Sequence, residues 1–396
     1  MQGREILNNR VLAEEVIAMR RHIHEYPCVS EHEEETVAYI SEKLTQWGIP
    51  HEVILDGCSI VGYIEGGKDG PVVGLRADID ALPIQEETGL PYASRVPGVM
   101  HACGHDCHTA VLLGAAKVLA SMREELCGSV KLFFQPAEES IGGAERMIQA
   151  GCLENPHVDY VLGLHVGAAY HTGTVAVRYG KMYAASDMID IVIHGKGSHG
   201  ASPHQGVDAI AVAAAVISTV QTVVSRNVSP VNSAVCSFGM IHGGTVRNQI
   251  SDKVELSGII RTLDPETRVS VRNQVKHIAE GVAASMGAHA EFHVVESYGP
   301  LINDDRMSAM VEKNIENFLG KENVILEQEP HLGSEDFSYF ALERPSCFFH
   351  LGCYHEKLGE QVGAHNSGFM PDEDALIIGV ALQVENVLSL MRGELK

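Results

Sequence analysis

The spacing of hydrophobic residues predicts two helices at the start of the chain. Over residues 6–25, apolar side chains recur every three to four positions, as in a helix with one buried face, and Pro27 ends the segment. A second helical pattern covers residues 33–47, and Gly48 and Pro50 follow it. We therefore expect the chain to begin with two amphipathic helices joined by a short turn.

Short apolar runs further along the chain have the length and composition of buried strands. Helical patterns alternate with them at residues 109–122, 307–319 and 372–391. The strand candidates are residues 51–55, 59–65, 72–76, 130–135, 159–165 and 347–351. Strands that alternate with helices are typical of an α/β fold, so we expect a mixed, mostly parallel sheet packed between helices.

The pattern changes near residue 185, where alternation of apolar and polar residues replaces the long buried runs. The elements predicted from here are a strand at 188–195, a helix at 206–225, strands at 234–241 and 253–261, a helix at 265–286 and a strand at 289–295. This order is that of a ferredoxin-like α+β domain. We therefore expect residues 1–184 and 297–396 to form one domain, with residues 185–296 inserted as a second.

Length and composition narrow the class of protein. A chain of 396 residues exceeds one ordinary domain, which supports two. Its net charge of −23 argues against nucleic acid or an anionic membrane as a partner. The sequence has no apolar run long enough to span a bilayer, so we expect no membrane anchor. Nine cysteines without a disulfide spacing, and an N-terminus without a signal-peptide pattern, predict a cytoplasmic protein with reduced thiols.

One short segment, residues 100–110, concentrates side chains that bind metals. It holds three histidines, two cysteines and one aspartate, and a helix pattern follows it directly. Cys103 and His105 flank a glycine, so a tight turn can direct both side chains toward one point. Sulfur and imidazole donors bind divalent Zn, Co, Ni or Mn. The alternative is a polar loop that holds a buried, unreactive cysteine.

Other metal-binding residue types follow the predicted strands. Asp78 and Asp80 come after one strand, Glu138 and Glu139 come after another, and His165 ends a third. Taken singly, these residues fit a turn, a helix cap or a solvated helix start. Their repeated position predicts ligands gathered over the C-terminal ends of a parallel sheet. The adjacent glutamates fit a division of roles, in which one binds the metal and the other takes a proton from the water that the metal activates.

The motifs around these residues resemble those of a known family. In order along the chain they read RADIDALP (76–83), MHACGHD (100–106), FQPAEE (134–139), GLHV (163–166), GSHG (197–200) and SEDF (334–337). With them the chain resembles the amidohydrolase branch of the co-catalytic metallopeptidase superfamily. That branch includes hippurate hydrolases, N-acyl-amino-acid amidohydrolases, auxin-conjugate hydrolases, N-acetyl-diaminopimelate deacetylases and some bacterial carboxypeptidases.

The resemblance implies roles for individual residues. Those that look like the ligands of a two-metal centre are Cys103, His105, Glu139, His165 and His365. Glu138 looks like the general base and acid, and Asp80 looks like the residue that orients a ligand from behind. Asp78 falls where other branches have a metal-binding histidine, so its role stays open. The residues that look like substrate contacts from the inserted domain are His199, Asn248 and Arg261.

The resemblance also implies an assembly. In related enzymes the histidine that matches His199 reaches the active site of a neighbouring subunit, and the arginine that matches Arg261 binds a substrate carboxylate. The inserted domain is then a dimerisation (lid) domain on a phosphorylase/hydrolase-like di-metal peptidase domain. A four-stranded sheet leaves edge strands that a second copy can pair with, so we expect a homodimer or homotetramer.

The function implied is metal-dependent cleavage of the amide bond of N-acyl amino acids, by attack of metal-activated water with Glu138 as base and acid. Two divalent ions per subunit are expected, with Zn, Mn, Ni and Co all open. A dipeptidase or carboxypeptidase on the same centre is the alternative, because the attack chemistry is identical. A metal-binding scaffold without catalysis would need neither Glu138 nor His199 nor Arg261. Cys107 stands where the family usually has glycine, which leaves open which cysteine binds.

Overall fold

The computed structural model describes residues 3–395, which fold into two compact units. The large unit contains the chain up to Gly180, Ile302–Glu329 and the chain from Asp336 onward, and the inserted unit contains Lys181–Leu301 and Pro330–Glu335. The chain thus passes between the units a few residues outside the expected positions 185 and 296. Strands β7 (Gly180–Tyr183) and β14 (Leu301–Asn303) mark these two points.

The large unit is built around a mixed eight-stranded sheet with the strand order β1-β2-β4-β3-β5-β16-β6-β15. Its strands are β1 (His51–Ile54), β2 (Ser59–Ile64), β3 (Lys68–Asp78), β4 (Cys127–Gln135), β5 (Tyr160–His171), β6 (Val175–Val177), β15 (Val324–Leu326) and β16 (Ser346–Tyr354). The central strands β4, β3, β5 and β16 are parallel neighbours, which confirms the predicted α/β class. Because these strands are parallel, their C-terminal ends meet at one edge of the sheet.

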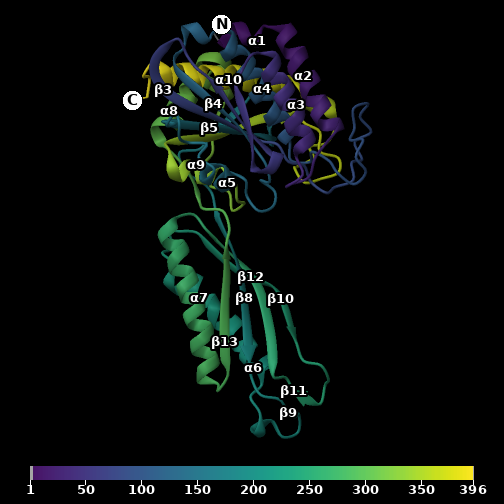
Figure 1. The fold of residues 1–396 in the computed structure, drawn as a ribbon. Coiled ribbons are helices and arrows are strands. Elements are labelled where there is room, and N and C mark those ends of the chain that lie inside the picture. Colours follow the sequence, from purple (N-terminus) through teal and green to yellow (C-terminus); the bar gives the residue numbers. More distant parts are fainter. Residues whose placement is uncertain (1–2, 396) are drawn as a thin grey trace. The chain divides into compact units, whose positions relative to one another are not determined.

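Helices cover both faces of this sheet (Figure 1). On one face α2, α4 and α10 pack on one another, and on the other face the short helices α5 and α9 are in contact. The helices of this unit are α1 (Gly3–Leu7), α2 (Arg10–Glu25), α3 (Glu34–Gln46), α4 (His105–Ser121), α5 (Ala144–Gln149), α8 (Asp305–Leu319), α9 (Ser338–Glu343) and α10 (Asp374–Met391). α4 is buried along almost its whole length, as its Ala, Leu and Val content requires.

The prediction of one continuous helix over residues 6–25 is wrong at its start. The chain forms α1, which ends at Leu7, and then α2, which begins at Arg10. Asn9 caps α2, because its side-chain oxygen accepts a hydrogen bond of 3.1 Å from the Leu12 amide. An asparagine that satisfies an otherwise unpaired amide in this way starts a new helix.

The inserted unit is a four-stranded antiparallel sheet with the order β10-β12-β8-β13. Along the chain it consists of β8 (Ala185–His194), α6 (Ala209–Thr222), β10 (Ala234–Gly243), β12 (Lys253–Thr262), α7 (Pro265–Ser285) and β13 (His289–Glu296), with a small sheet of β9 (Ser198–His199) and β11 (Gln249–Ile250). Apolar side chains of both helices and of the sheet form its core. Order and pairing confirm the ferredoxin-like fold of this unit, and β10 and β13 are the edge strands of its sheet.

Two helices are long and apolar enough to cross a membrane by length and composition alone, Ala209–Asn227 and α10. α10 lies mostly inside the core of the large unit. α6 buries Val212, Val216 and Val220 against the lid sheet at helical spacing. Both helices therefore have packing partners within the folded chain, and the expected lack of a membrane anchor stays a prediction.

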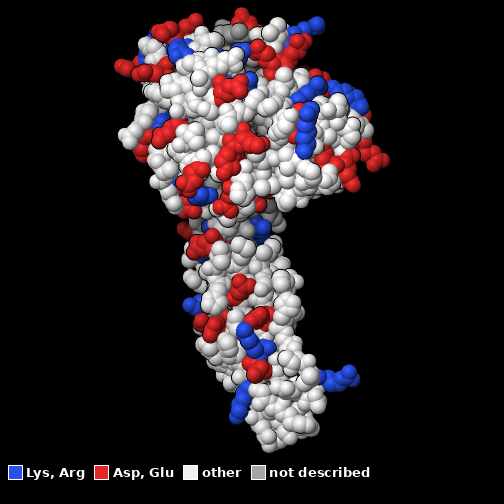
Figure 2. Space-filling model, turned by 45° about the vertical axis from the view of Figure 1, so that its right-hand side comes forward, with Lys and Arg blue, Asp and Glu red and all other residues white. Residues whose placement is uncertain are grey.

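Charged side chains are spread over the face of the molecule that Figure 2 shows. In the view of Figure 2, acidic side chains are distributed over the visible face of the large unit, and the basic side chains lie among them. The net charge of −23 reflects an excess of Asp and Glu (52) over Lys and Arg (29), and on the visible face the carboxylates are not gathered in one patch. Such a surface does not attract polyanions.

Replacing Gly114 by alanine tests the packing of α4 against its neighbours. A Cβ atom there would lie 2.7 Å from Val380 Cγ2 and 2.8 Å from Val16 Cγ2. We expect the free energy of unfolding to fall by about 1–3 kcal/mol, because overpacking outweighs the gain in helix propensity. Gly281→Ala in α7 is the matched control, since a Cβ there meets nothing within 4 Å, and it should add about 0.5–1 kcal/mol. Urea unfolding measures both, and equal effects would contradict the packing.

Candidate metal centre

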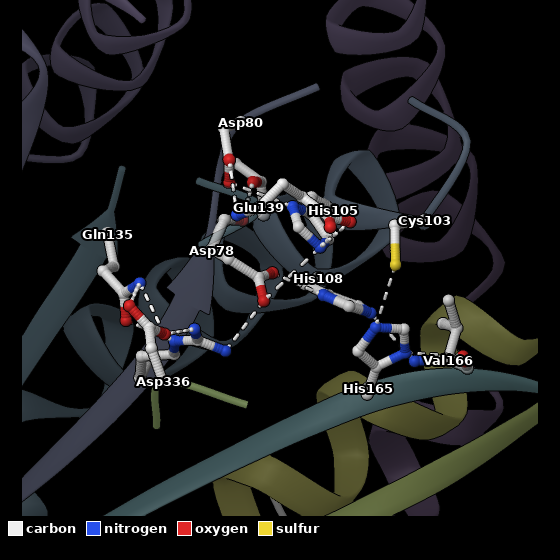
Figure 3. Close-up of polar contacts among 12 residues, drawn as sticks. Asp78, Asp80, Cys103, His105, His108, Gln135, Glu139, His165, Val166 and Asp336 are labelled. Carbon is white, nitrogen blue, oxygen red and sulfur yellow. Dashed lines mark hydrogen bonds and ion pairs between the residues drawn. The ribbon is translucent and has the colours of Figure 1, made fainter. Parts of the chain in front are cut away.

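Side chains from three adjacent strands and their following loops meet at one edge of the large sheet (Figure 3). Asp78 ends β3, Asp80 follows it, Glu139 follows β4, and His165 lies in β5. Because β4, β3 and β5 are parallel neighbours, β4 and β3 end at this edge and β5 runs past it. The expectation that His165 ends its strand is wrong, since β5 continues to His171 and His165 lies inside it. The structure therefore brings together residues that the sequence places after separate strands.

A left-handed glycine joins the first two candidate ligands. Gly104 has a φ of +89° and caps α4, so Cys103 precedes the helix and His105 is its first residue. A Cβ atom at Gly104 would lie 2.3 Å from Val166 Cγ2. Only glycine combines this backbone conformation with such a close approach, and the resulting turn points both neighbours into the centre.

His105 is held in a tautomer that suits a metal ligand. Its Nδ1 lies 3.2 Å from Asp80 Oδ1 and donates to that carboxylate, so Nε2 keeps its lone pair. This Nε2 is buried and has no hydrogen-bond partner within residues 3–395. It lies 3.7 Å from Asp78 Oδ2 and 3.8 Å from Glu139 Oε1. A buried ring nitrogen without a hydrogen bond is costly, and a cation at this point would satisfy it.

His165 and Cys103 face each other. His165 Nδ1 donates to the Val166 carbonyl at 2.8 Å, so its Nε2 offers a lone pair 3.4 Å from Cys103 Sγ. Burial raises the pKa of the Cys103 thiol well above its ordinary value, because the thiolate would lose its hydration. A cation between these two atoms would hold Cys103 as the thiolate that metals bind.

His365 reaches the same region from the loop before α10. Its backbone has a φ of +61°, and its amide donates to the Ala102 carbonyl at 2.8 Å, which ties this loop to the segment that carries Cys103. His365 Nε2 lies 3.0 Å from Glu139 Oε1. The Glu139 carboxylate therefore lies between His365 and His105.

The five expected ligands form two overlapping groups of donor atoms. The ligand atoms of Cys103, His105 and His165 lie within 4.8 Å of one another, and so do those of Cys103, Glu139 and His365. Sulfur, imidazole and carboxylate donors in one place suit Zn, Co, Ni or Mn. Donor chemistry, spacing and the buried His105 nitrogen all fit a divalent metal centre.

Glu138 lies beside this centre as a second carboxylate. One of its oxygens is within 4.8 Å of the donor atoms of His105 and Glu139. The residue is only 8% exposed, so its surroundings exclude most bulk water. A carboxylate in this position can take up and return a proton at the centre.

Asp78, whose role the sequence leaves open, is occupied by neighbouring donors. Its Oδ1 accepts a hydrogen bond of 2.5 Å from His108 Nδ1, and its Oδ2 accepts one of 2.7 Å from Arg76. Burial alone would raise the pKa of Asp78, but the charge of Arg76, together with the hydrogen bond from His108, brings it well below its ordinary value. Asp78 is therefore an ionised anchor beneath the centre, turned toward its donors.

His108 is a residue of the site that the sequence did not reveal. Its Nδ1 is bound to Asp78, and its Nε2 accepts a hydrogen bond of 2.8 Å from the Val166 amide. With both nitrogens occupied, His108 supports the centre and is not a ligand. The available signal was its spacing, since residues three apart on a helix share a face and His105 begins the same helix.

Cys107 and Cys103 have different surroundings. Cys107 belongs to the hydrophobic core of the large unit, whereas Cys103 lies against His165. The cysteine that the structure places at the centre is therefore Cys103.

The expected substrate residues lie at opposite ends of the inserted unit. His199 pairs with Gln249 across β9 and β11, beside Asn248, at one end of the sheet (Figure 1). Arg261 pairs with Ser186 at the end where the chain enters the unit. A strand advances about 3.3 Å per residue, so the intervening length of β12 is roughly 26 Å. One copy of the unit does not bring His199 and Arg261 together.

Comparison with known proteins identifies the family. Residues 74–388 match the model of a protein family described as Peptidase family M20/M25/M40. The chain belongs to this family. An N-acyl-L-amino acid amidohydrolase of Geobacillus stearothermophilus is 43% identical over 292 residues, covering 74% of this chain and 78% of the relative. Thermostable carboxypeptidase 1 of Saccharolobus solfataricus is 38% identical over 374 residues, covering 93% and 94%.

A solved structure agrees with this assignment. It is described as a dinuclear metal binding peptidase of the M20 family from Bacillus subtilis, and it is 35% identical. The two structures superpose with a TM-score of 0.85 over 97% of this chain and 99% of the other. These similarities confirm the expected amidohydrolase branch, and the chain is a metal-dependent amidohydrolase of the M20 family.

A buried ionic network supports the metal centre of this M20 amidohydrolase from behind. Asp106, the residue after His105, accepts hydrogen bonds from Arg20 at 2.6 Å and from His24 at 2.8 Å. The other ring nitrogen of His24 lies 3.3 Å from Glu86. Burial alone would raise the pKa of Glu86, but hydrogen bonds from His24, Thr88 and the Ser94 amide lower it to about 2.

The Glu86 contacts predict a pH dependence of stability. A carboxyl group whose pKa is lowered on folding stabilises the protein above its unfolded value and loses that contribution as it is protonated. For Glu86 the loss falls between pH 4.5 and about 2. We expect Glu86→Gln to reduce stability near neutral pH, and the difference from the natural chain to shrink across that range.

Urea unfolding of the metal-free proteins at several pH values measures this difference. Glu124→Gln is the control, because Glu124 is exposed on the surface. A Glu86→Gln difference that stayed constant between pH 4.5 and 2 would contradict the assigned contacts.

Proposed function

We propose that this chain hydrolyses the amide bond of N-acyl amino acids and holds two divalent cations while it does so. The observation that carries the proposal is Glu138, a shielded carboxylate placed beside a complete set of metal donors. The similarity to an N-acyl-L-amino acid amidohydrolase supports this substrate class. We further propose that the protein is cytoplasmic, in line with its nine cysteines, all described and all unpaired.

Two overlapping donor groups support two cations. We propose that His105 and His165 with Cys103 hold one, that His365 with Cys103 holds the other, and that Glu139 lies between them. Bound cations would polarise the substrate carbonyl and lower the pKa of the attacking water. The chain's own contribution is orientation, since Asp80 and the Val166 carbonyl set the ring tautomers of His105 and His165.

Glu138 would carry the proton through the reaction. Its carboxylate takes the proton from the attacking water and returns it to the nitrogen of the leaving amino acid.

The lid residues would bind the rest of the substrate. A buried guanidinium nitrogen of Arg261 has no hydrogen-bond partner in the described part of the chain, which suits a substrate carboxylate.

A second copy of the chain is part of this proposal. His199 and Arg261 lie at opposite ends of the lid unit, so we infer that His199 of one subunit serves the centre of another. The edge strand β10 exposes Met240 and Ile241, each more than half accessible. Pairing of this edge with another copy would cover them.

A carboxypeptidase or dipeptidase activity is the second candidate. It is supported by the similarity to a carboxypeptidase over more than nine-tenths of both chains. Attack on the amide carbon would use the same residues. The activities differ only in whether the acyl side of the substrate is a simple acid or an amino acid.

The proposal is tested by metal analysis combined with a substrate panel of N-acetyl amino acids, hippurate and dipeptides. We expect two metals per chain and turnover of the N-acyl compounds. Glu138→Gln should keep both metals and lose about 10²–10⁴-fold in kcat, because general acid–base catalysis is removed. Glu145→Gln, an exposed glutamate of α5, is the matched control and should leave kcat unchanged.

Other outcomes of the panel redirect the proposal. Turnover of dipeptides alone would establish the peptidase candidate. A metal-free protein after preparation without chelators would contradict the centre, and full activity of Glu138→Gln would remove the assigned base.

Mixed dimers test whether His199 acts across subunits. Each of His199→Ala and Glu138→Gln should be nearly inactive alone. In a mixed dimer, one site combines Glu138 of one subunit with His199 of the other. Random mixing should therefore restore about a quarter of the natural activity, because half of the dimers are mixed and each has one complete site. If His199 acted within its own subunit, mixing would restore nothing.

A further inference from the structure

Glu33 lies beneath the turn that carries Glu138. It is completely buried, at the position just before α3. Its Oε1 accepts two backbone hydrogen bonds, of 2.9 Å from the Ala137 amide and of 3.0 Å from the Glu31 amide. A side chain from the N-terminal part of the chain thus binds the residue that directly precedes Glu138.

The residue that Glu33 binds has an unusual backbone. Ala137 has a φ of +55°, in the left-handed region that non-glycine residues seldom adopt. Its carbonyl accepts a hydrogen bond of 2.9 Å from the Gly142 amide, which closes the turn from the other side. Such a conformation persists where surrounding groups hold it. At Ala137 the groups that do so are Glu33 and Gly142.

A second carboxylate holds the other side of Glu138. Asp80 Oδ2 accepts hydrogen bonds from the Glu139 amide at 3.0 Å and from the Ser30 hydroxyl at 2.7 Å. The amides before and after Glu138 are therefore each bound to a buried carboxylate. Rotation of either peptide would turn the Glu138 side chain away from its present direction.

Because Glu33 directly precedes α3, its side chain could serve simply as the cap of that helix. Its hydrogen bonds exclude this role. A helix cap accepts a hydrogen bond from an amide in the first turn of its own helix. The Glu33 side chain makes no such bond to α3. Its carboxylate is directed to Ala137, more than a hundred residues away in the sequence.

We propose that Glu33 is a positioning residue for the general base: by binding the Ala137 amide it maintains the left-handed turn that directs Glu138 at the metal centre. This inference rests on the proposed function, which assigns the base role to Glu138. What the turn needs from residue 33 is a hydrogen-bond acceptor at the place of Oε1. Glutamine offers the same acceptor on a side chain of the same length, whereas alanine removes it.

The surroundings of Glu33 agree with a role that depends on the acceptor and not on charge. Burial and the nearby Asp80 carboxylate raise the pKa of Glu33 to about 7. A neutral side chain is therefore compatible with this position.

Steady-state kinetics of the metal-loaded enzyme test the proposal. We expect Glu33→Ala to lower kcat by about 10²-fold with KM within about threefold, because the base is displaced and the substrate contacts remain. Glu33→Gln should stay within about threefold of the natural kcat. Glu35→Ala is the matched control, since Glu35 is an exposed glutamate in the first turn of α3 and should not change kcat. If Glu33→Ala does not fold, Glu33→Asp replaces it, because the shorter side chain withdraws the acceptor.

Hydrogen exchange provides a readout that does not depend on activity. The Ala137 amide should exchange slowly in the natural chain and in Glu33→Gln, and much faster in Glu33→Ala. Natural kcat and slow exchange in Glu33→Ala would overturn the proposal, and so would equal loss of kcat in Glu33→Gln and Glu33→Ala. If the natural chain hydrolysed neither N-acyl amino acids nor dipeptides, the proposed function would fail. Unchanged exchange of the Ala137 amide in Glu33→Ala would separately refute the claim that Glu33 maintains this turn.

Discussion

A carboxylate buried away from water is stable only where hydrogen-bond donors or cations surround it, and this constraint organises the centre of the protein. Asp78 is bound by Arg76 and His108, and Asp80 is bound by Ser30, His105 and the Glu139 amide. Each of these contacts stabilises the negative charge of the aspartate and also fixes the position of the group that donates the hydrogen bond. The direction of the His105 ring and of the turn that carries Glu138 both depend on them.

The same constraint is consistent with the different roles proposed for two adjacent glutamates. Glu139 lies between His105 and His365, where a cation would neutralise its charge. Glu138 is shielded from solvent beside it, which suits a group that accepts a proton and later releases it. Neighbours in a chain that turns sharply point in different directions, so adjacent residues of one type can perform different chemistry. The left-handed Ala137 produces that turn.

The proposed assembly rests on the length of the sheet in the inserted unit. A four-stranded antiparallel sheet is long compared with an active site, so residues at its two ends do not meet within one copy. Family M20/M25/M40 includes relatives named for different reactions, among them a carboxypeptidase and an amidohydrolase. Such different reactions are compatible with one hydrolytic centre if the proposed substrate contacts lie on the inserted unit. The contacts can then change while the centre stays the same.

Sequence alone determined the α/β class, the inserted ferredoxin-like unit and the candidate ligands at the strand ends, because these depend on local periodicity and on residue type. The break between α1 and α2, the length of β5 and the return of Pro330–Glu335 to the inserted unit were not predicted. Only the tertiary structure decided that Asp78 and His108 bind each other while His105 Nε2 stays available as a candidate ligand, and that Cys107 is a core residue. It also decided that Glu33 reaches Ala137. These outcomes depend on contacts between segments far apart in the chain, and residue types and spacing do not specify which hydrogen bonds such segments will form.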